Sequence, residues 1–281
     1  MKKYFALIIL VVLMYIPKTV HALDYINNLG VTISEEEYTN LRKIYSEQYI
    51  SVLDQDKFDQ IKNMDLDFDS VQNTVKYIKT EHNQVTGEII ETELTQEEYE
   101  NVDTQAQTRA TVIGTSYKQI GLTLVKTSEI NDTAYFSFSA VWKIMPAVRS
   151  FDVNGVRFSN MERVNGTQQG KQVYTLNGET DYVQYNFNGT NINNFSNGFG
   201  ISMNLLNSDV TYLESSIDCS MAINAYPAGL FTSYQHAIEN VSLATSKNYT
   251  IGVGLGSVFV FNNGISSKYD GMEGTYDYFS S

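Results

Sequence analysis

Tyrosine side chains are the residues of this chain with the clearest capacity to bind a ligand. The sequence holds 20 Tyr and 14 Phe in 281 residues. Aromatic side chains are densest in two short polar stretches. The first contains Tyr182 and Tyr185, and the second contains Tyr276 and Tyr278. An exposed Tyr can stack on a sugar ring or anchor a protein partner. We take these four as candidate ligand-binding residues; the alternative is that Tyr is simply a common strand residue.

Cysteine and histidine offer little catalytic chemistry. Cys219, the only Cys, lies on the apolar parity of an alternating stretch, 213–225, which predicts a buried and inert thiol. His82 and His236 are too few for a zinc site, which needs several His or Cys ligands. A Ser-His-Asp triad around His236 is arithmetically possible, but no nucleophile-elbow motif accompanies it. The sequence therefore predicts no catalytic residue, no metal site and no cofactor.

Carboxylates are abundant but not arranged in a specific motif. Asp65, Asp67 and Asp69 match the opening of an EF-hand calcium loop. Ser70 stands where that loop needs Gly, and Lys76 where it needs Glu, which favours a generic acidic linker. A pair of carboxylates for glycoside hydrolysis remains an open alternative, because their separation is set only in three dimensions.

The N-terminus has the layout of an export signal. Lys2 and Lys3 precede an apolar run at 4–16, and Val20 and Ala22 are small residues before Leu23. The run is shorter than the roughly 20 residues that a membrane-spanning helix needs. An uncleaved anchor is the alternative. We expect residues 1–22 to be removed, and a secreted, bacterial-type protein without disulfides to remain.

Charge excludes two classes of partner. The whole chain has 19 basic and 32 acidic residues. Removing residues 1–22 removes three Lys and no acid, so 16 basic residues remain against 32 acidic ones, a net charge of −16. Such a chain repels nucleic acid backbones and anionic membrane surfaces. We expect an extracellular glycan or protein as the partner, with no nucleic acid and no membrane binding after signal cleavage.

Residues 23–102 are predicted to form short helices and a β-hairpin. The segments 33–41, 53–61 and 94–102 share a pattern of an apolar residue, a capping residue, an aromatic and a second apolar residue. Ser34, Asp54 and Thr95 are the expected N-caps, and Glu37 and Glu98 the partners that complete capping boxes. A repeated docking element is the alternative explanation of this pattern.

The hairpin is expected between the second and third helix starts. Residues 75–79 and 88–93 are the two expected strands, and Gly87 supplies the permissive backbone that the turn between them needs. Residues 103–110 are polar and aperiodic, which predicts a linker to a domain at 111–281.

The domain at 111–281 is predicted to be an antiparallel β-sandwich, or a barrel, built around the stretch 135–159. Residues 136–144 alternate strictly, so Trp142 should be buried and the parity of Tyr135 should face water. At Asn154-Gly155 the apolar parity flips, which favours a bulge over a hairpin. Asn-Gly turns separate further expected strands, at Gln172–Leu176, Asp181–Phe187, Phe199–Leu205, Thr211–Ala225, Leu230–Ala237, Tyr249–Phe261 and Gly274–Phe279.

The function that these features favour is a secreted, non-catalytic binding or adhesion protein acting through the surface of a β-sandwich. The alternative is an extracellular glycan hydrolase using two carboxylates. A membrane-active protein using the Gly-rich stretch 250–261 is a third hypothesis. That stretch is more simply a buried strand, and the acidic charge opposes lipid binding.

Signal cleavage predicts a defined N-terminus for the exported protein. Mass spectrometry of material recovered outside the cell should show a chain that begins at Leu23, because Val20 and Ala22 fit the cleavage positions. Recovery of protein that retains Met1 would contradict export by cleavage.

Overall fold

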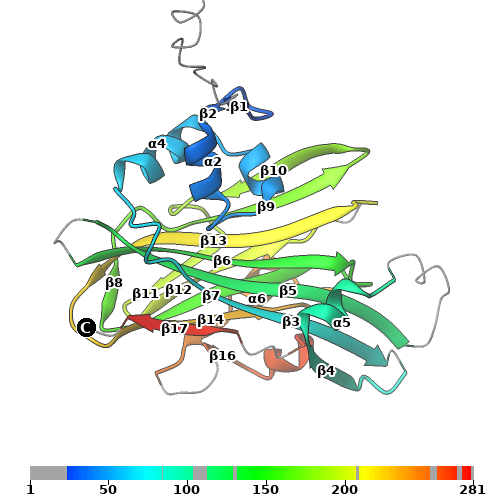
Figure 1. Cartoon of the computed structure of the whole chain (residues 1–281). Helices are drawn as coiled ribbons and strands as arrows, with labels where there is room; N and C mark the ends of the chain where they lie inside the picture. The colour runs from blue at the N-terminus through cyan, green and yellow to red at the C-terminus, as the bar shows by residue number, and fades with distance from the viewer. Residues whose placement is uncertain are drawn as a thin grey trace, which may run out of the picture.

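The computed structural model describes residues 24–83, 85–103, 113–128, 132–206, 209–253, 258–270 and 274–279. Residues 1–22, the expected signal peptide, lie outside these ranges, as does nearly all of the expected linker at 103–110. The described chain is mainly β, with antiparallel sheets packed together and short helices near the N-terminus (Figure 1). The predicted fold class is confirmed.

Two sheets contain most of the strand residues of the described chain. The larger has eight described strands in the order β10-β9-β13-β6-β5-β3-β4, with β8 also paired to β13. The smaller has five, in the order β11-β12-β7-β14-β17. The strands of the larger sheet are β3 (Gln72–Asn83), β4 (Ile89–Leu94), β5 (Ile113–Lys126), β6 (Thr133–Ile144), β8 (Met161–Arg163), β9 (Gln169–Leu176), β10 (Glu179–Tyr185) and β13 (Tyr212–Ile223); those of the smaller are β7 (Phe151–Ser159), β11 (Ile192–Phe195), β12 (Gly198–Asn204), β14 (Ala228–Gln235) and β17 (Tyr276–Phe279).

Apolar side chains fill the space between the two sheets. Phe136 of β6 packs toward Phe199 of β12, with ring centroids 6.2 Å apart. Ile120 of β5, Ile217 of β13 and Leu230 of β14 are buried in the same cluster. Burying such side chains between facing sheets is the main stabilising contribution in a sandwich.

Strand β6 follows the predicted alternation on one side and departs from it on the other. Phe136, Phe138 and Trp142 all face the core between the sheets, as expected. Tyr135 and Ser137, expected to face water, are also buried. The correction has a physical cause: the N-terminal helices cover this face of the larger sheet, so Tyr135 belongs to a second apolar cluster with them.

The helical layer begins where the sequence predicts. Ser34, Asp54 and Thr95 each accept a hydrogen bond from the backbone N–H three residues on, and the predicted capping boxes are both present. The helices are α2 (Glu35–Leu41), α3 (Glu47–Ser51), α4 (Gln55–Asn63) and α5 (Gln96–Glu100), preceded by the small hairpin β1 (Tyr25–Ile26) and β2 (Thr32–Ile33). No described helix is long and apolar enough to cross a membrane.

The predicted hairpin is present and extends the larger sheet. Strand β3 pairs with β4 on one side, and Gly87 takes a positive φ of 72° in the turn between them. On its other side β3 pairs with β5 along its whole length, from Gln72↔Leu124 to Asn83↔Ile113. Strands β3 and β4, before residues 103–110, and β5, after them, therefore lie in one sheet.

Strand β7 is straight through Asn154-Gly155, so the expected bulge there is wrong. It pairs with β12 and β14 without a register shift. The apolar parity flips because both faces are buried: Val156 faces the core between the sheets, whereas Val153 faces a third cluster. A Cβ at Gly155 would lie 2.1 Å from the Phe259 ring, so Gly is required for that ring to approach.

The stretch 249–261 forms a hairpin in place of the single buried strand that the sequence predicts. Strands β15 (Tyr249–Ile251) and β16 (Phe259–Phe261) pair with each other, and Val253 between them is exposed; residues 254–257 lie outside the described ranges. The hairpin, with α6 (Leu243–Ser246) and the 3-10 turn η1 (Ile265–Lys268), lies on the outer face of the smaller sheet. The other six expected strands are all present, with ends shifted by a few residues.

Replacing Trp142 by Ala tests the core. Its indole is 2% exposed, donates to the Tyr234 hydroxyl at 3.2 Å and packs edge-on against His236. The cavity left by Trp142→Ala should lower the free energy of unfolding by about 3–5 kcal/mol in urea titrations. Phe187→Ala, at an aromatic that is 47% exposed, should change it by less than about 0.5 kcal/mol. Equal effects of the two substitutions would contradict this packing.

Candidate functional site

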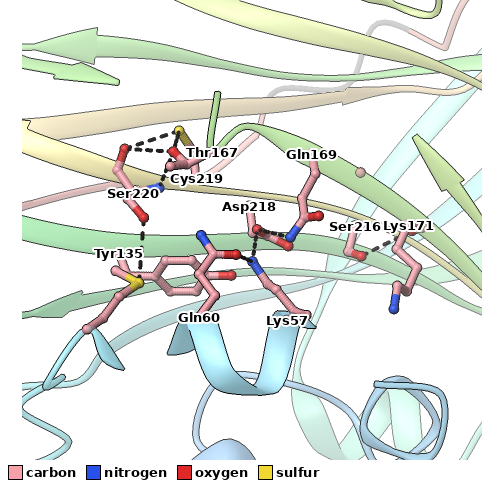
Figure 2. A network of polar contacts seen from close by, with 12 residues as sticks. Lys57, Gln60, Tyr135, Thr167, Gln169, Lys171, Ser216, Asp218, Cys219 and Ser220 are labelled. Carbon is pink, nitrogen blue, oxygen red and sulfur yellow. Dashed lines mark hydrogen bonds and ion pairs between the residues drawn. The ribbon is translucent and has the colours of Figure 1, made fainter. Parts of the chain in front are cut away.

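A buried ion pair joins the helical layer to the larger sheet. Lys57 of α4 lies 2.5 Å from Asp218 of β13, and the two side chains are 4% and 1% exposed. Figure 2 shows Lys57 reaching from the helix to Asp218 on the strand, beside Gln169. Asp218 also accepts hydrogen bonds from Gln169 at 3.1 Å and from the Tyr49 hydroxyl at 3.3 Å. Buried charges need this degree of pairing, because desolvation is otherwise too costly.

Lys171 of β9 makes a second link of the same kind. Its ammonium donates to the backbone carbonyl of Val52 at 3.0 Å and lies 3.5 Å from the carboxylate of Asp54, the N-cap of α4. Burial lowers the pKa of Lys171, partly opposed by Asp54 and Asp218. These groups satisfy one another, so the network positions the helices and leaves no side chain directed at a ligand.

A second buried cluster surrounds His236 inside the sandwich. The Nδ1 atom of His236 lies 3.0 Å from Asp152 of β7, and the Tyr234 hydroxyl donates to the same carboxylate. Lys118 pairs with Asp270 close by, with both side chains fully buried. A carboxylate that orients an imidazole is one half of a catalytic triad.

The cavity beside His236 is too small for a substrate. Its volume is about 30 Å³, and its lining includes His82, Thr80 and Ser116. That volume holds a water molecule or two, whereas ligand sites usually span about 300–1,000 Å³. The geometry brings together the two histidines that the sequence analysis singled out, but it favours a structural role for the pair of His236 and Asp152.

A larger cavity lies on the helix-side face of the larger sheet, and we call it the sheet-face groove. Its volume is about 400 Å³, within the usual range for ligand sites. One wall is the segment 42–48, which runs from the end of α2 into the first turn of α3, and Tyr212 of β13 also lines the groove. The floor comes from adjacent strands β3, β5 and β6, through Val75, Gln119, Gly121, Thr123, Ser139 and Val141.

Gly121 leaves open space in the floor of the sheet-face groove, because it has no side chain. A Cβ placed there would meet only the Ser139 hydroxyl, at 3.7 Å. Around this open centre the groove presents the amide of Gln119 and the hydroxyl of Ser139, whereas the Thr123 hydroxyl donates to Asn73 at 2.6 Å. These groups donate and accept hydrogen bonds without carrying charge. The groove is therefore suited to a polar ligand with many hydroxyl or carbonyl groups.

One buried carboxylate lies behind the wall of the groove. Glu214 of β13 accepts hydrogen bonds from the Ser46 hydroxyl and, at 2.6 Å, from the Tyr212 hydroxyl. Burial raises the pKa of Glu214, and the hydrogen bonds from Ser46 and Tyr212 partly oppose it. These hydrogen bonds hold Ser46 and Tyr212 in fixed orientations at the groove.

The four tyrosines predicted to bind ligand do not form one site. Tyr182 and Tyr185 lie on β10, an edge strand of the larger sheet, and they pack into different apolar clusters. Tyr276 and Tyr278 lie on β17, an edge strand of the smaller sheet, and are 62% and 55% exposed. The two pairs belong to different sheets, so a single ligand at either edge would contact only one pair.

The remaining predicted residues lie away from the groove. Cys219 is buried in the core between the sheets, as predicted, and burial raises the pKa of its thiol to about 12. Asp65 lines a separate cavity of about 240 Å³ between α2 and α4. Asp67 accepts a hydrogen bond from the backbone N–H of Asp69. Among the described residues, no group of three or more His, Cys, Asp or Glu side chains could hold a metal ion.

Sequence reasoning missed the sheet-face groove, although a weak signal for it exists. Ser139 stands on the parity of β6 that the alternation pattern assigns to water, and Gln119 and Thr123 stand on the corresponding parity of β5. A polar face with a Gly at its centre is the expected floor of a binding surface on a sheet. The wall at 42–48 gave no signal, because its position over the sheet depends on how α2 and α3 dock.

Comparisons with known proteins assign no family to this chain. No protein-family model matches the chain, and no curated protein matches it. Four solved chains match, among them the enzymatically active domain of tailspike protein 4 of bacteriophage CBA120. That match has a TM-score of 0.22 and 10% identity, and covers 55% of this chain and 18% of that one, so it carries no inference about fold or activity.

Breaking the ion pair between α4 and β13 tests how the helical layer is held. Asp218→Asn leaves the Lys57 ammonium buried without its counter-charge and should lower the free energy of unfolding by about 3–5 kcal/mol. The matched control is Lys62→Met, also on α4, which removes an exposed ion pair with Glu37 and should cost no more than about 1 kcal/mol. Urea titrations followed by circular dichroism measure both; a small loss for Asp218→Asn would contradict a close buried pair.

Proposed function

We propose that this chain is an exported extracellular protein that binds a glycan in the sheet-face groove without catalysing a reaction on it. The observation that carries the proposal is the groove itself, which has a volume of about 400 Å³, is open, and has uncharged polar side chains around a Gly in its floor. Sugars present many hydroxyls, and the amides and hydroxyls of the floor can pair with them in both directions. Export rests on the N-terminal sequence pattern alone.

The rigidity of the groove supports binding. Its floor is three neighbouring strands in the middle of the larger sheet, and its wall is anchored by Ser46 and Tyr212 on the buried carboxylate of Glu214. A preformed site loses little side-chain entropy when a ligand binds. The tyrosines on the strand edges remain a second place where the same protein could contact a partner.

Glycan hydrolysis is the second candidate function, and one observation favours it. The raised pKa of Glu214 is the property that a general acid requires. Against it, Glu214 is 2% exposed and lies behind Tyr212 and Ser46. Hydrolysis needs two carboxylates on either side of the scissile bond, and Glu47 is the carboxylate among the described groove-lining residues.

Filling the groove tests the proposed function. Gly121→Phe should fold, because nothing crowds a Cβ there, and its ring should occupy the floor. A glycan array probed with the full chain should give hits whose affinity, measured by calorimetry, falls at least about tenfold in this variant, a loss of about 1.4 kcal/mol. Thr250→Phe is the control, because it adds the same ring at an exposed strand position on β15.

The other outcomes separate the alternatives. If Gly121→Phe binds as tightly as the unchanged protein, the ligand site lies elsewhere, with the edge tyrosines as the next surface to test. Release of reducing sugar from a bound glycan, abolished by Glu214→Gln, would replace binding by hydrolysis as the function.

A further inference from the structure

We propose that the glycan of the sheet-face groove is acidic, and that Arg42 and Lys43 bind its carboxylate. This inference rests on the proposed function and adds the chemical class of the ligand. Both cations belong to the wall of the groove, in the segment that links α2 to α3. They are adjacent in sequence and both line the groove, beside a floor of uncharged side chains.

Neither cation forms an ion pair within the described chain, although the positive charge of Arg42 lowers the pKa of the buried carboxyl of Glu214 behind the wall. The hydrogen bonds described for them run to backbone carbonyls: Arg42 donates to Tyr45 at 3.2 Å, and Lys43 donates to Phe68 at 3.1 Å. Among the described residues, the ion pairs of the chain involve other cations, such as Lys57, Lys62 and Lys171. In a chain with 32 acidic and 19 basic residues, two neighbouring cations without a carboxylate partner are available to a ligand.

The carbonyl contacts also fix the two cations for recognition. A guanidinium has several N–H donors in a planar fork, and one contact to Tyr45 leaves most of them free. A carboxylate can accept two parallel hydrogen bonds from such a fork, and Lys adds a point charge beside it. The uncharged floor would then bind the hydroxyls of the same sugar, so the two parts of the groove match the two parts of a uronic or sialic acid.

The acidity of the whole chain does not oppose this assignment at physiological salt. Charges beyond about 8 Å are largely screened at that ionic strength, so a ligand in the groove experiences mainly its nearest charges. Glu47 is the negative exception in the groove wall. Its carboxylate favours an orientation in which the acidic group of the ligand lies toward Arg42 and Lys43 and the neutral hydroxyls face Glu47.

Matched pairs of saccharides test the inference with the full chain. Oligogalacturonates are compared with their methyl esters, and sialyllactose with its methyl ester, so the members of each pair differ only in whether the carboxyl group is charged. The acidic member should bind at least about tenfold more tightly, as expected for a charge-assisted hydrogen bond. In Arg42→Gln/Lys43→Gln the preference for the acidic members should vanish.

The control and the remaining outcomes keep the two proposals apart. Lys268→Gln removes one positive charge on η1, where Lys268 pairs with Glu239 at the surface, and should leave the preference intact. Equal binding of both members of every pair overturns the acidic ligand and leaves glycan binding standing. Binding to none of these saccharides and to nothing on the glycan array overturns the proposed function itself. Arg42 is exposed and Lys43 half-buried, so the double variant should fold, which its melting temperature checks.

Discussion

The covered face of the larger sheet is the constraint on which the rest of this structure depends. A sheet in a sandwich normally buries one face and leaves the other to water. Here α2, α3 and α4 lie across part of the second face, and the pair of Lys57 and Asp218 secures them there. Because those charges are buried, the helices must dock where both charges are satisfied. There the Lys57 ammonium pairs with the Asp218 carboxylate, which also accepts hydrogen bonds from Gln169 and Tyr49.

The smaller sheet is also covered on its outer face, but by aromatic packing in place of a buried ion pair. The outer face of the smaller sheet is covered by the hairpin β15–β16, which packs through aromatic rings in place of ions. Gly155 admits the Phe259 ring, and Gly200 admits the ring of Tyr249. Strands β6 and β7 are therefore buried on both faces at their centres, which is why neither shows a simple alternation of core and water along its whole length.

Partial cover also explains where a ligand could bind. Helices α2 and α4 lie toward the β9–β10 side of the larger sheet (Figure 1). The sheet-face groove lies over β3, β5 and β6, with the segment 42–48 as one wall. Its floor continues the polar parity of β5 and β6 that the helices cover farther along. Stability and binding thus share one face: the buried network positions the wall, and the uncovered strands supply the floor.

Local features of the chain were readable from sequence because they depend on neighbouring residues. The N-caps Ser34, Asp54 and Thr95, the turn at Gly87 and the burial of Trp142 all follow from short-range spacing. These features sufficed for the class of fold and for most strands, since capping geometry and alternation are set within a few residues.

Only the tertiary structure decided what covers each strand and what each polar side chain meets. Tyr135 is buried because helices some 80 residues earlier in the chain lie over it. Lys57 pairs with Asp218, which is 161 residues away in the sequence. The groove brings together the segment 42–48, β5 and Tyr212, which share no sequence motif. Sequence periodicity reports that a residue faces one side of a strand, but the partner on that side is chosen by the packing of distant segments.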